Sequence, residues 1–70
     1  MIKLEINPRI YSLKNVEIVL NLYKELADIK QVVTLDKIIL TFNDCRLDEK
    51  LTVREFENYL IGLENTNAIN

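Results

Sequence analysis

Apolar and charged residues alternate at the start of the chain. Ile2, Leu4 and Ile6 are separated by single charged residues, and a period of two places their side chains on one face of a β-strand. Pro8 then follows Asn7, and proline lacks the N–H group that a sheet ladder requires. The pattern therefore predicts a strand over residues 2–6.

A helical pattern follows, from Leu13 to about Ala27, and Ser12 before it has the side chain of a helix N-cap. Its apolar residues recur every three or four positions and cover more than the roughly 100° of an ordinary surface helix. They are Leu13, Val16, Ile18, Val19, Leu20, Leu22, Tyr23, Leu26 and Ala27. We expect a second helix, or another chain, to cover part of this wide face.

Two short segments rich in β-branched residues come next, residues 32–35 and 38–42. They predict a hairpin with its connection at residues 36–37. The second strand would direct one set of side chains inward: Ile38, Leu40 and Phe42.

The last helix is predicted to begin at Thr52, because Thr52 and Glu55 have the spacing of a capping box. Apolar residues at helical spacing form its buried face: Val53, Phe56, Leu60 and Leu63. Residues 65–70 are polar, so we expect them to form a frayed tail.

These elements give the order β-α-β-β-α. We predict an α+β fold, a two-layer α/β sandwich in which a three-stranded sheet carries both helices on one face. A chain of 70 residues accommodates one domain. We place that domain at residues 1–64 and the tail at residues 65–70.

Composition then excludes several kinds of chemistry. The chain has no histidine, one cysteine and one glycine. It therefore contains no Ser-His-Asp or Cys-His arrangement, no internal disulfide or cysteine-rich zinc site, and no glycine-rich phosphate loop. We expect no catalytic residue, no cofactor and no bound metal.

Charge and hydropathy narrow the class of partner. The formal net charge is -2 and the nine Lys and Arg residues are scattered, so we expect no nucleic-acid partner. No apolar run approaches the about 20 residues of a membrane span, and the N-terminus does not resemble a signal peptide. A single free thiol suits a reducing compartment, so we expect a cytoplasmic protein.

Two local clusters have a chemical and a structural interpretation. The spacing from Asp44 to Glu55 matches a calcium loop, but Arg46 at its third position and Glu49 at its sixth do not fit such a site. Acidic residues before a helix instead favour its N-terminal dipole. Cys45 lies beside a cation that could lower a thiol pKa, but without a histidine or a second cysteine we interpret it as a structural thiol.

Two short motifs resemble a known family. The opening Ile6-Asn7-x-x-Ile10-Tyr11-Ser12-Leu13-x-x-Val16 resembles that of HxsD-type proteins from His-Xaa-Ser maturation systems, and so does the closing helix, Arg54-Glu55-Phe56-Glu57-Asn58-Tyr59-Leu60-Ile61. The acidic loop around Cys45 departs from the basic, proline-containing stretch of that family.

The resemblance implies a small non-catalytic component, encoded with bacterial radical-SAM maturases that modify a ribosomal peptide. Such a component would hold the precursor peptide or bridge it to the enzyme. A three-stranded sheet has open edges, and an extended peptide could add to one of them as a further strand. Residues 2–6 or the second hairpin strand would provide that edge.

Two classes of function stay open beside this adaptor. One is a structural homodimer, in which Ile18, Leu22 and Ile29 contact a symmetry mate. The other is a small phage or host regulatory inhibitor that acts through its surface. Either way we expect a protein or peptide partner and a homo- or hetero-oligomer, through these interface candidates: Tyr11, Ile18, Leu22, Ile29, Ile2, Leu4 and Ile6.

Overall fold

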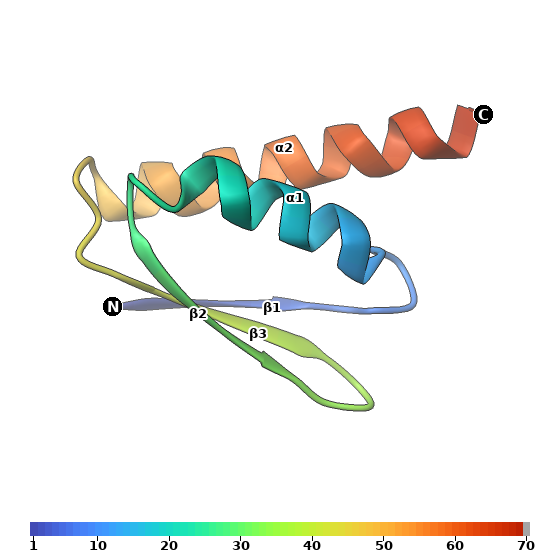
Figure 1. The fold of residues 1–70 in the computed structure, drawn as a ribbon, viewed down its shortest axis with the longest axis horizontal. Helices are drawn as coiled ribbons and strands as arrows, with labels where there is room; N and C mark the ends of the chain where they lie inside the picture. The colour runs from blue at the N-terminus through green and yellow to red at the C-terminus, as the bar shows by residue number, and fades with distance from the viewer. Residues whose placement is uncertain (70) are drawn as a thin grey trace.

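The computed structural model describes the backbone of residues 1–69 and the side chains of residues 1–66. Its elements are β1 (Ile2–Ile6), α1 (Leu13–Tyr23), β2 (Asp28–Val33), β3 (Ile38–Asn43) and α2 (Glu49–Ile69). The predicted order is confirmed. Both helices lie on one face of the sheet, with α1 and α2 side by side and antiparallel (Figure 1).

The strand order in the sheet is β1-β3-β2, and both outer strands run antiparallel to β3. β1 and β2 are therefore parallel to each other but are separated by β3, which makes β1-α1-β2 a split β-α-β unit. One expectation is wrong: the second hairpin strand is not an edge, because β1 pairs with its far side. The two edges of the sheet are β1 and β2.

The core lies between the sheet and the helices. The inward residues of β3 are fully buried, as the alternation predicts: Ile38, Leu40 and Phe42. The ring of Phe56 from α2 packs edge-on against Phe42, with centroids 5.2 Å apart, and against Tyr23 of α1 at 5.4 Å. Phe56 thus joins the sheet and both helices.

The boundary between α1 and β2 differs from the prediction. α1 ends at Tyr23, where the N–H groups of Leu26 and Ala27 both donate to the Tyr23 carbonyl and turn the chain. Ala27 is still buried after the turn, which explains why it matched the helical pattern. β2 begins at Asp28, four residues before the predicted strand.

The hairpin connection is shifted by one residue. The N–H of Thr34 donates to the Lys37 carbonyl at 2.9 Å. Leu35 and Asp36 are therefore the two central residues of the turn, in place of residues 36–37.

α2 begins at Glu49, three residues before the predicted start. Asp48 caps it, because its Oδ1 accepts a hydrogen bond from the N–H of Leu51 at 2.9 Å. Thr52 is inside the helix and donates its hydroxyl to the Asp48 carbonyl at 2.8 Å, so the predicted capping box is wrong. The helix continues to Ile69 through most of the expected tail, and Asn70 lies outside the described residues.

Over residues 1–69, neither helix combines the length and the apolar character that crossing a bilayer requires.

Candidate functional site

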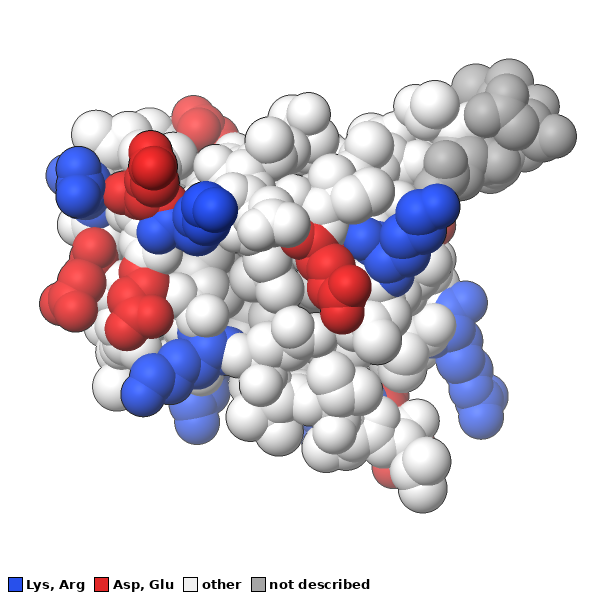
Figure 2. All heavy atoms as spheres, in the orientation of Figure 1, with Lys and Arg blue, Asp and Glu red and all other residues white. Residues whose placement is uncertain are grey.

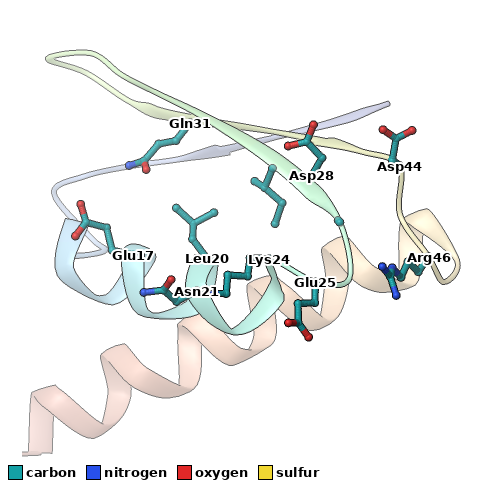
Figure 3. A pocket seen from close by; sticks show the side chains of 11 residues that line it. Glu17, Leu20, Asn21, Lys24, Glu25, Asp28, Gln31, Asp44 and Arg46 are labelled. Carbon is teal, nitrogen blue, oxygen red and sulfur yellow. The ribbon is translucent and has the colours of Figure 1, made fainter.

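A groove of about 840 Å³ opens between α1 and β2 (Figure 3). Leu20 of α1 and Gln31 of β2 point into it from opposite sides, and Ile29 and Ala27 complete its inner surface. We refer to this hollow as the α1–β2 groove. Its uncharged lining combines the aliphatic Leu20, Ala27 and Ile29 with the amides of Asn21 and Gln31, which suits aliphatic side chains with a few polar contacts.

The groove exists because the helices leave β2 partly uncovered. The inward side chains of central β3 are fully buried, whereas on β2 Ile29 and Gln31 are only half-buried and Val33 is 53% exposed. The sheet therefore extends beyond the helical layer on this side. An additional strand next to β2 would lie beneath the open side of α1.

The backbone of β2 offers hydrogen-bonding groups along that edge. Antiparallel partners alternate between bonded and non-bonded pairs, and the Thr34–Lys37 pair at the turn is a bonded one. Because bonded and non-bonded pairs alternate from that turn, Ile29, Gln31 and Val33 belong to non-bonded pairs. Their backbone N–H and C=O groups therefore point away from β3, toward the open edge. The side chains of these three residues are on the groove side of the sheet.

The loop after β3 and the turn between α1 and β2 meet at one end of the groove. Asp44 turns the chain after β3 with φ of 51°, in the left-handed region that Asp tolerates better than most residues. The N–H of Arg46 then donates to the Leu26 carbonyl at 2.8 Å, which ties this loop to the α1–β2 turn. The contact places Asp44 and Arg46 at the mouth of the groove.

Six charged residues surround the groove: Glu17, Lys24, Glu25, Asp28, Asp44 and Arg46. The carboxylates of Asp28 and Asp44 lie at its outer rim and point away from α1 (Figure 3). The ion pairs in the described part of the chain, Met1–Glu49 and Lys37–Glu5, include none of the six. Figure 2 shows acidic and basic side chains interspersed at the end of the molecule where α1 leads into β2. Acids outnumber bases by four to two, which favours an occupant with basic side chains.

The structure separates the predicted interface residues. Ile29 lines the groove, whereas Ile18 and Leu22 are exposed on α1 and are not among its lining residues. Tyr11 is half-buried against the core.

The predicted edge strand is also partly covered. Ile2 and Leu4 of β1 are half-buried on the helix side, and Ile6 is buried. What β1 leaves exposed is therefore its backbone edge and the opposite face of the sheet.

Gln31, Leu20 and Arg46 were not predicted to lie together. Gln31 carried a usable signal, since a polar residue at an inward position marks a strand that the core does not fully cover. The signal was lost because the strand was predicted to begin at residue 32. Arg46 reaches the groove through a loop contact that has no local pattern.

Cys45 is the one thiol of the chain. Burial, and next the Glu49 carboxylate, raise the pKa of the Cys45 thiol above its ordinary value, which is the opposite of what activates a nucleophilic cysteine. Within the described residues, no group of three or more Cys, Asp or Glu side chains is placed to hold a metal ion.

Comparison of the chain with protein-family models, with curated proteins and with solved structures returns no match in any of the three.

Proposed function

We propose that this chain is a small non-catalytic adaptor that binds an extended peptide segment of a partner along β2, in the α1–β2 groove. The observation that carries the proposal is that an unpaired strand edge and a hollow lie side by side. In strand addition, main-chain hydrogen bonds provide affinity and pockets for alternate side chains provide specificity. β2 with its groove offers both.

The register defines the segment. The bound strand would exchange hydrogen bonds with Ile29, Gln31 and Val33, and its residues opposite these three would direct their side chains into the groove. β2 has six residues, so the segment spans about six residues, or roughly 20 Å. We expect an aliphatic side chain against Leu20 and a basic side chain near the acidic rim.

The resemblance to HxsD-type proteins suggests the source of the peptide. A ribosomal precursor peptide would occupy the groove, and Ile18 and Leu22 would contact a radical-SAM maturase in the cytoplasm. These two residues are 39% and 53% exposed, and their spacing of four places them on one side of α1. An adaptor needs two such separate surfaces.

The test is titration of a fluorescently labelled precursor leader peptide, followed by anisotropy. Leu20→Glu should weaken binding at least tenfold, because it places a carboxylate inside the groove. Leu22→Glu is the matched control, since Leu22 is on the same helix but outside the groove, and it should leave peptide affinity unchanged.

Asp28→Lys tests the charge of the rim without touching the core, and should weaken a basic peptide several-fold. Absence of binding at high micromolar protein would overturn the proposal. So would binding that Leu20→Glu and Asp28→Lys both leave intact.

A further inference from the structure

The opposite edge of the sheet has an unusual pattern. β1 reads Ile-Lys-Leu-Glu-Ile. Its apolar residues are symmetric about Leu4, and its two charges, Lys3 and Glu5, are of opposite sign at equal distances from it. We propose that β1 pairs with β1 of a second copy of this chain, antiparallel about a two-fold axis at Leu4, which joins two sheets into one of six strands.

The backbone of β1 has the groups for this pairing. In β3, the backbone N–H and C=O groups of residues 39 and 41 point toward β2. Those of residues 38, 40 and 42 point toward β1. Those three pair with Ile6, Leu4 and Ile2. The N–H and C=O groups of Lys3 and Glu5 therefore point to the open edge.

Charge then selects one register. With the axis at Leu4, each Lys3 lies opposite Glu5 of the other copy, so both pairs across the junction have opposite charges, which is stabilising. A shift by two residues places like charges opposite each other. A shift by one residue places Lys3 and Glu5 opposite residues of the other copy whose backbone groups are already hydrogen-bonded to β3. The strand is complementary to itself in one arrangement, as a closed two-fold dimer requires.

The side chains involved are free to make these contacts. Lys3 and Glu5 are exposed on the face of the sheet away from the helices. Glu5 makes one ion pair, to Lys37 at 3.5 Å, and both partners are largely solvated, so that contact is weak. Lys37 approaches from the β3 side, whereas Lys3 of the second copy would approach from the open side.

Pairing also buries aliphatic surface on the apolar face of β1. Ile2 and Leu4 are only half-buried beneath the helices. In the paired register Leu4 lies opposite Leu4, and Ile2 lies opposite Ile6, so the apolar row of one core continues into the next. Exposed aliphatic surface is removed from water without a change of backbone conformation.

α2 and β1 are inclined to each other (Figure 1). α2 is near β1 at its N-terminal end, where Glu49 pairs with the Met1 amino group at 2.8 Å, and it diverges from β1 toward its C-terminus (Figure 1). The two-fold axis places the near end of one α2 opposite the distant end of the other.

A pair of five-residue strands is a small interface, below the size of most stable dimers. We therefore expect association in the micromolar range or weaker, measured by sedimentation equilibrium over a series of protein concentrations. Lys3→Glu and Glu5→Lys should each raise the dimer dissociation constant at least tenfold, because each places like charges opposite each other.

The double variant K3E/E5K should restore dimerisation, since the two charges are exchanged and remain complementary. An equimolar mixture of K3E and E5K should form a heterodimer that neither variant forms with itself. Lys30→Glu is the matched control, because it makes the same charge change on an exposed residue of β2 on the same face of the sheet. It should leave dimerisation unchanged.

A wild-type chain that remains monomeric at millimolar concentration would overturn the proposal, as would a dimer that neither single charge reversal weakens. If circular dichroism shows that a variant is unfolded, amide hydrogen exchange of the wild type tests the β1 pairing instead. Protection of the Lys3 and Glu5 N–H groups that rises with concentration supports the pairing, and unchanged protection contradicts it. Because β1 and β2 are opposite edges, this result is independent of peptide binding in the α1–β2 groove.

Discussion

At the scale of single residues, Glu64 holds the start of α1. Its Oε1 accepts hydrogen bonds from the N–H of Ser12 at 2.6 Å and from Nδ2 of Asn15 at 3.0 Å. Ser12 is the predicted N-cap and accepts from the N–H of Asn15. A carboxylate from α2 thus satisfies the buried Asn15 and adds negative charge where the dipole of α1 favours it.

These contacts make stability depend on the ionisation of Glu64. The Ser12 N–H, and next the Asn15 amide, hold the pKa of Glu64 below its ordinary value of 4.5. A carboxyl with a lowered pKa in the folded state stabilises the fold above its unfolded pKa, and this contribution is lost as the pH falls through the folded value. We predict that Glu64→Ala lowers the urea midpoint at neutral pH.

The difference between wild type and Glu64→Ala should shrink as the pH falls below about 4.5. Glu57→Ala, an exposed acid on the same helix, serves as the control and should leave the midpoint nearly unchanged. A difference for Glu64→Ala that is independent of pH would contradict the assignment.

At the scale of elements, Phe56 connects the three parts of the core. It is fully buried and contacts Phe42 of β3 and Tyr23 of α1 edge-on. Burial, and next the Glu55 carboxylate, raise the pKa of Tyr23, so its hydroxyl stays neutral beside this contact. Loss of the Phe56 ring removes a contact of α2 with both neighbours at once.

We predict that Phe56→Ala costs about 3–5 kcal/mol. A single core of this size supplies about that much net stability, so the variant should be largely unfolded by circular dichroism at room temperature. Phe56→Leu should cost about 1 kcal/mol and stay folded, so that its urea midpoint can be measured. Tyr59→Ala, on a half-exposed position of the same helix, should have a smaller effect than Phe56→Ala.

The elements were predictable from sequence where burial is one-sided and regular. β1 alternates between apolar and charged residues, and β3 alternates in burial, because one face of each strand packs on the core. β2 was predicted too short because its first residues are charged or half-exposed, as expected of an uncovered edge. Asp48 and Thr52 both have side chains suited to an N-cap, and only the hydrogen bond to Leu51 distinguishes them.

At the scale of the whole molecule, the strand order could not be read from any local pattern. Pairing of β1 with β3 joins residues more than 30 positions apart, and the α1–β2 groove exists only because that pairing leaves β2 outside. The sequence indicated which side chains face inward. It did not indicate which strand the helices would leave uncovered, and so the groove residues were missed as a group.

Substitution of an aliphatic residue by lysine has opposite consequences at an exposed and at a buried position of the molecule. Leu35 is 99% exposed in the hairpin turn and is not among the residues that line the α1–β2 groove. We predict that Leu35→Lys changes the free energy of unfolding by less than about 0.5 kcal/mol and reduces aggregation in light scattering. Leu40→Lys, which buries a charge in the central strand, should prevent folding. A large loss of stability from Leu35→Lys would show that the hairpin turn packs against the core.

The central position of β3 has a consequence during synthesis. β1, α1 and β2 leave the ribosome before β3, yet β1 and β2 are not neighbours in the sheet, so these three elements contain no strand pair of the folded structure. The sheet assembles only once residues 38–43 have emerged, and α2, which covers it, comes later still. Until then the Ile-Lys-Leu-Glu-Ile strand is unpaired on both sides, in the nascent chain where a chaperone or a neighbouring polypeptide would meet it first.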